Sequence, residues 1–176
     1  LVKKKIFNKL KTQFPKAEIV LCSTAGEIYQ NVVQDNSQVA VAFEFGDTKI
    51  KTASVCIKDF ENSYDAAVHL SNQITKGDLA YILVISDGSL VNGSELVKGF
   101  SGVKKQVLVT GGLAGDAANF KSTLVGLNEQ PTEGKIVAIG FYGKKIFVTH
   151  GSQGGWDMFG LEKEITKSTG NILYEI

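Results

Sequence analysis

The chain has 176 residues, of which 43% are hydrophobic, so it is long enough to bury one substantial core. Nineteen basic residues, all of them lysine, stand against eighteen acidic residues, and the formal net charge is +1. This balance excludes a strong net electrostatic potential that would attract nucleic acid or an anionic membrane. The lack of arginine disfavours a protein that recognises phosphate or guanine. We expect one domain, residues 1–176, with neither nucleic acid nor a membrane among its partners.

The cysteine content and the start of the chain indicate a cytoplasmic protein. Two cysteines are too few for a disulfide framework, and the first residues, LVKKK, lack the pattern of a signal peptide. The apolar runs are also far shorter than the roughly 20 residues that a membrane-spanning helix needs.

The first predicted elements are a helix, a strand and a hairpin. An amphipathic helix opens the chain and ends at Pro15. A strand at residues 18–21 follows, and strand-like runs at 39–45 and 50–57 flank a Gly46-Asp47-Thr48 turn, which predicts an antiparallel hairpin. The apolar positions of the helix are Ile6, Phe7, Leu10 and Phe14.

Two helices and two buried strands are predicted in the middle of the chain. We expect Ser63 to cap a helix over residues 64–75, which Lys76-Gly77 ends, and Ser94 to cap a shorter one. Strands at 79–85 and 107–109 flank this second helix. The order strand, helix, strand predicts parallel pairing of the two strands.

The C-terminal part predicts successive strands. The runs at 123–128, 135–142 and 145–150, with Gly143 turning the last pair, predict an antiparallel meander. The expected fold class is therefore α/β, with a mixed sheet in which a parallel strand-helix-strand part is flanked by helices and followed by an antiparallel C-terminal meander.

Three predicted strands each end in a loop of small residues that carries one acid. The loops cover residues 22–27, 86–93 and 110–116, and the acids are Glu27, Asp87 and Asp116. Because the carboxyl ends of parallel strands form a ligand crevice, three parallel strands would bring these loops to one sheet edge.

Acids that converge on such a crevice would suit an ammonium group, while free loop N–H groups would accept a carboxylate. This favours a small polar metabolite resembling an amino acid. The alternative is that each acid separately caps a helix or forms an Asx-turn. The candidate ligand-binding residues are Cys22, Ser23, Thr24, Gly26, Glu27, Asp87, Asn92, Gly111, Gly112, Asp116, His150 and Trp156.

The sequence also contains residues that could serve other chemistries. Cys22 or the strand-end acids could serve an enzyme, but no histidine is near Cys22 in the sequence, and a buried cysteine usually behaves as a small hydrophobe. Haem needs only one axial ligand, for which His150, His69 or Cys22 could serve, although a lysine-only chain is less suited to two propionates. No histidine and cysteine spacing matches a zinc site. We expect no catalytic residues, no metal and no cofactor.

Three segments resemble a known family. CSTAGEI at residues 22–28, GGLAGD at 111–116 and TKSTGNILYE at 166–175 are similar, in order and spacing, to the N-terminal half of FIST domains, which are sensory modules of bacterial signal transduction. The resemblance implies an intracellular sensor of small metabolites such as amino acids, not an enzyme. The implied partners are a small-molecule ligand, a C-terminal FIST half and a signalling output domain such as a kinase.

The family usually has a strand before the opening helix and a second FIST half after the final Tyr-Glu-Ile. This sequence contains neither of these parts, and it therefore resembles an excised fragment. The missing half could complete the ligand site.

Overall fold

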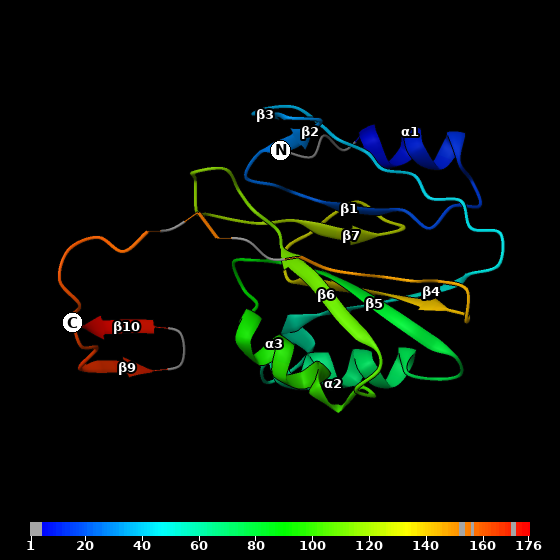
Figure 1. The fold of residues 1–176 in the computed structure, drawn as a ribbon. Coiled ribbons are helices and arrows are strands. Elements are labelled where there is room, and N and C mark those ends of the chain that lie inside the picture. Colours follow the sequence, from blue (N-terminus) through cyan, green and yellow to red (C-terminus); the bar gives the residue numbers. More distant parts are fainter. Residues whose placement is uncertain (1–4, 152–153, 156, 170–171) are drawn as a thin grey trace.

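The computed structural model describes residues 5–151, 154–155, 157–169 and 172–176. At its centre is a four-stranded mixed sheet (Figure 1). Its strands, in spatial order, are β4 (Lys49–Cys56), β8 (Lys135–Tyr142), β5 (Leu79–Ser86) and β6 (Leu108–Leu113). β8 runs antiparallel to both of its neighbours, whereas β6 pairs parallel with β5 and ends the sheet. The predicted α/β class and the parallel strand-helix-strand unit are confirmed.

Helices cover one face of this sheet. They are α2 (Ser63–Ile74), α3 (Gly93–Gly99) and the short 3-10 helix η2 (Phe100–Gly102) (Figure 1). Side chains alternate along β8, so Ile136 and Ala138 pack with Leu70 of α2 in the main core, while Val137 lies in a second core on the other face. A further 3-10 helix, η1 (Ile57–Asp59), links β4 to α2.

A two-stranded ribbon covers the opposite face. β1 (Val20–Cys22) pairs antiparallel with β7 (Val125–Leu127), and the ribbon buries Val125 against Val137 of β8. The expectation that the first strand would join the parallel strands is therefore wrong. Figure 1 shows α1 (Lys5–Gln13), the predicted opening helix, and the hairpin of β2 (Glu27–Tyr29) and β3 (Val32–Gln34) on this side.

The two middle helices begin at caps other than those predicted. Asn62, rather than Ser63, caps α2, since its side chain accepts a hydrogen bond from the Asp65 N–H. The Ser63 hydroxyl instead accepts from the Asn92 N–H. Asn92, rather than Ser94, caps α3. Asparagine accepts these bonds as well as serine does, so sequence preference alone does not separate neighbouring candidates.

The predicted hairpin and meander pair differently from expectation. Residues 39–45 form no strand, and β4 takes β8 as its partner instead. Residues 145–150 form no strand either, because β8 is buried on both faces and both of its edges are already paired. The antiparallel C-terminal pair is β9 (Lys167–Thr169) with β10 (Ile172–Glu175). No helix in the described part of the chain is long and apolar enough to cross a membrane.

Candidate functional site

The three small-residue loops lie together in the structure, at a place we name the loop junction. It is formed by residues 23–24, 86–88 and 114–116. The Ala114 N–H donates to the Ser86 carbonyl at 2.7 Å, and the Gly115 N–H donates to the Ser23 carbonyl at 3.2 Å. The loops thus meet although β1 is not parallel to β5 and β6, because the β1–β7 ribbon lies over the sheet.

The glycines of the junction allow backbone to pack directly on backbone. A Cβ at Gly88 would lie 2.3 Å from the Ala114 carbonyl oxygen, and one at Gly115 would lie 2.6 Å from the Ala25 nitrogen. The Thr123 hydroxyl accepts from the Gly88 N–H at 2.8 Å and joins the segment just before β7 to the same place. These small residues contact one another, so their size has a structural explanation.

Asp87 is fully buried and anchors the junction to the sheet. Its Oδ1 accepts from the Ser89 and Leu90 N–H groups, both at 2.7 Å, and its Oδ2 accepts from the Gly134 N–H at 2.9 Å. Three charge-assisted bonds to backbone hold this carboxylate inside the protein.

The other two acids also serve their own loops. Asp116 Oδ2 accepts from the Ser122 and Lys121 N–H groups, both at 3.0 Å, and these bonds, that of Ser122 first, lower the pKa of the carboxyl. Glu27 accepts from the Thr24 hydroxyl and from the Ser37 hydroxyl, and the Thr24 bond is the main cause of its lowered pKa. In this arrangement all three acids accept hydrogen bonds within the fold, which is the Asx-turn alternative for Asp87 and Asp116.

The CSTAGEI segment at residues 22–28 begins at the end of β1 and is held by neighbouring segments of the chain. The Ser23 hydroxyl accepts from the Leu124 N–H at 2.9 Å, and Gly26 lies against Asp35 and Val33. Burial raises the pKa of the Cys22 thiol, which disfavours the thiolate form that a nucleophilic cysteine needs.

The remaining candidates are Asn92, His150 and Trp156. Asn92 caps α3 with its side chain. His150 is exposed, and Trp156 lies outside the described residues. The His69 ring lies 5.3 Å from the Phe60 ring between centroids, and the two rings are tilted by 56°. Within the described ranges, no group of three or more histidine, cysteine, aspartate or glutamate side chains could hold a metal ion.

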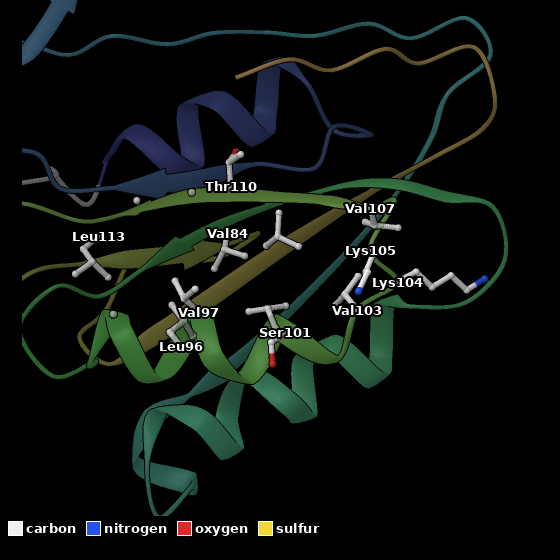
Figure 2. A pocket seen from close by; sticks show the side chains of 15 residues that line it. Val84, Leu96, Val97, Ser101, Val103, Lys104, Lys105, Val107, Thr110 and Leu113 are labelled. Atoms are coloured by element: carbon white, nitrogen blue, oxygen red, sulfur yellow. The ribbon is translucent and has the colours of Figure 1, made fainter. Parts of the chain in front are cut away.

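A cavity of about 580 Å³ lies beside the loop junction, between β6 and the helical segment α3–η2 (Figure 2). Its walls are apolar and include Val84, Leu96, Val97, Phe100, Val107 and Val109. Of the predicted ligand-binding residues that the structure describes, only Gly111 and Gly112 line it.

Polar groups stand at the margins of this cavity. Lys104 and Lys105 line the end where η2 leads into β6, and Figure 2 shows the Lys104 side chain extending away from the cavity. The Thr110 side chain points to the other face of the sheet, where its hydroxyl lies 2.6 Å from that of Tyr81. Since β6 is an edge strand, part of its backbone N–H and C=O groups also face away from β5.

Sequence reasoning missed this cavity and its lysines. The sequence feature that could have indicated the cavity is an excess of apolar residues after α3. Val103, Val107 and Val109 follow this helix, which has only seven residues and cannot cover all three side chains. A short helix over a longer apolar strand leaves uncovered space.

Fold and site together define a small α/β domain that has a mixed sheet, a tightly bonded loop junction and an open apolar cavity beside its edge strand. The FIST N domain family model matches residues 2–176, so the chain belongs to the FIST N family, whose members are sensory domains of signal transduction. Comparisons with curated proteins and with solved structures find no match.

Proposed function

We propose that this domain is the sensing part of a bacterial cytoplasmic signalling protein, and that it binds a small amino-acid-like metabolite in the cavity between α3 and β6. The observation that carries the proposal is the cavity itself. Its volume of about 580 Å³ falls within the roughly 300–1,000 Å³ of small-molecule sites, and such sites combine apolar walls with a few polar groups.

The ligand chemistry follows from the groups at the cavity margins. Lys105 supplies a positive charge for a carboxylate, and the apolar walls suit a hydrocarbon side chain. An ammonium group would donate to carbonyl oxygens along the free edge of β6, because the three loop acids are engaged in their own turns.

Binding would reach an output domain through the position of α3. This helix is short, and its N-terminal cap Asn92 adjoins the loop that Asp87 anchors. A ligand that contacts both α3 and β6 favours the spacing of these elements that fits it, and it shifts the population by its differential affinity for the two arrangements. An attached signalling domain or kinase would respond to that shift.

A thermal-shift screen of free amino acids and small carboxylates on the full-length protein tests this function. A true ligand stabilises the folded state by about 2.7 kcal/mol at 100 times its dissociation constant, so the melting temperature should rise with concentration. Lys105→Gln should reduce the rise, whereas Lys121→Gln, an exposed lysine that does not line the cavity, should preserve it. A screen in which no compound raises the melting temperature would contradict the proposal.

A further inference from the structure

The cavity between α3 and β6 has different chemistry at its two ends. Lys104 and Lys105 line the end where η2 leads into β6. At the other end the Leu113 side chain lies close to the start of α3, since a Cβ added at Gly93 would lie 3.3 Å from Leu113 Cδ1. Figure 2 shows the two lysines and Leu113 at opposite ends of the cavity. A ligand that spans the cavity therefore meets a basic end and an apolar end.

The space between these ends is elongated and follows β6. Because side chains alternate along a strand, Val107, Val109, Gly111 and Leu113 share the face that lines the cavity. Gly111 has no side chain, so Leu113 is the first side chain on this face beyond Val109. At the roughly 3.3 Å rise of each strand residue, the stretch from Val107 to Leu113 is about 20 Å long. Leu113 therefore stands where a chain that extends along β6 from the basic end would stop.

The volume and the walls of the cavity disfavour a small or polar side chain. A volume of about 580 Å³ has room for roughly 20 groups the size of a water molecule, so alanine or serine would fill only a small part of it. Among the described residues that line it, the only charged side chains are those of Lys104 and Lys105. Val84 and Leu96 are buried, and Figure 2 shows the Ser101 hydroxyl directed away from β6. A polar side chain placed among these walls would lose its water without gaining a partner.

We propose that the ligand is an amino acid with a long hydrocarbon side chain, and that Leu113 limits the length of the chain that the cavity accepts. This ligand class rests on the proposed function, in which the cavity is the sensory site. The carboxylate lies at Lys105, and the ammonium group donates to carbonyl oxygens on the free edge of β6. The hydrocarbon chain then extends past Gly111 to Leu113, where apolar walls replace water around it.

Calorimetric titration of the full-length protein with unbranched amino acids of increasing length tests the ligand class. From alanine through norvaline and norleucine to 2-aminododecanoate, each added methylene group should lower the dissociation constant by about fourfold until the chain reaches the end of the cavity. Glutamine is the matched polar control, because its side chain is about as long as that of norleucine, and it should bind no more tightly than alanine. Alanine or glutamine that binds as tightly as norleucine would overturn the proposal.

Substitution of Leu113 tests the limit on chain length. Leu113→Ala should move the limit to a longer member of the series, and Leu113→Phe should move it to a shorter one. Leu90→Ala is the matched control, because Leu113 and Leu90 are exposed by 50% and 48% and Leu90 does not line the cavity. Norvaline is too short to reach Leu113, so its affinity should be equal in all four proteins and reports that they are folded. A limit at the same length in wild type and in both Leu113 variants would overturn the role of Leu113.

Failure of the ligand class and failure of the sensory function give different results. If the domain binds no small metabolite, no compound raises the melting temperature and both proposals are wrong. If it senses a small or polar amino acid instead, that compound raises the melting temperature and Lys105→Gln reduces the rise, yet affinity does not increase along the series. In that case only the long-chain ligand class is wrong.

Discussion

The loop junction and the cavity meet along β6 but are filled in different ways. At the junction, backbone packs on backbone, and the buried Asp87 carboxylate accepts three backbone hydrogen bonds. In the cavity, apolar walls enclose about 580 Å³, and Lys104 and Lys105 stand at one end. The acids and glycines of the three loops therefore stabilise the fold, while the apolar residues around the cavity, many of them valines, leave the space for a ligand.

Because the junction is filled by protein groups and the cavity is open, substitutions in the two regions should have different measurable effects. Substitutions at the junction should change the free energy of unfolding, because each group there already has a protein partner. Substitutions at exposed positions of the cavity wall, such as Val97, should change ligand affinity and leave the free energy of unfolding nearly constant.

The largest effect is expected from Asp87→Ala. Removal of a buried carboxylate leaves the N–H groups of Ser89, Leu90 and Gly134 without their acceptor, so the free energy of unfolding should fall by about 3–5 kcal/mol. Urea denaturation measures the loss. Asp47→Ala is the control, because Asp47 is exposed and pairs with Lys145 at the surface. A loss no greater than that of the control would show that Asp87 does not anchor the junction.

A smaller loss is expected from Gly115→Ala. The new methyl group would lie 2.6 Å from the Ala25 nitrogen, and overpacking of this kind costs about 1–3 kcal/mol. Gly112→Ala, in the same motif, is the matched control, since nothing lies within 4 Å of a Cβ there. Thermal unfolding of the two variants compares them directly, and equal melting temperatures would argue against close packing at the junction.

Cys22 should react slowly with a thiol reagent in the folded protein. Burial raises the pKa of its thiol, so less of the reactive thiolate is present near neutral pH than for a free cysteine. Labelling kinetics of a Cys56→Ser variant isolate Cys22, and the rate should rise on unfolding in urea. Rapid labelling of the folded variant would instead support the enzyme alternative.

The smallest effect is expected from the titration of Asp116. Backbone hydrogen bonds lower its pKa in the folded state, so its stabilising contribution is present above its ordinary pKa and is lost as the pH falls through the lowered value. An NMR titration should find this pKa below the ordinary range of an aspartate side chain. An Asp116 pKa at or above that range would contradict the turn geometry.

The sequence predicted elements whose evidence is local. Apolar spacing and Pro15 placed α1, and the strand-helix-strand order gave the parallel pairing of β5 with β6. The pairing of β1 with β7, by contrast, depends on residues more than a hundred positions apart. Alternation at residues 39–45 predicted a strand, but a strand also needs a partner, and pairing is a property of the whole fold.

The same limit applies to the candidate site. Small residues and acids at strand ends correctly indicated loops that come together, as the bond from Gly115 to Ser23 shows. The hydrogen-bond donors of each carboxylate could not be predicted from the sequence, since the Asp87 carboxylate accepts from the Gly134 N–H, 47 positions away. The cavity likewise depends on how far the short α3 extends over β6.

The central claim is that the cavity, and not the junction acids, receives the ligand. Titration of the compound that the thermal-shift screen identifies, against Val97→Phe and Asp116→Asn, tests it most directly. Val97 lines the cavity and is 73% exposed, so a phenyl ring fits there without strain and occupies the ligand space, whereas Asp116 does not line the cavity. We predict that Val97→Phe weakens binding by about tenfold or more, that the exposed control Val33→Phe does not, and that Asp116→Asn binds like wild type. Full binding by Val97→Phe together with loss of binding in Asp116→Asn would contradict the account.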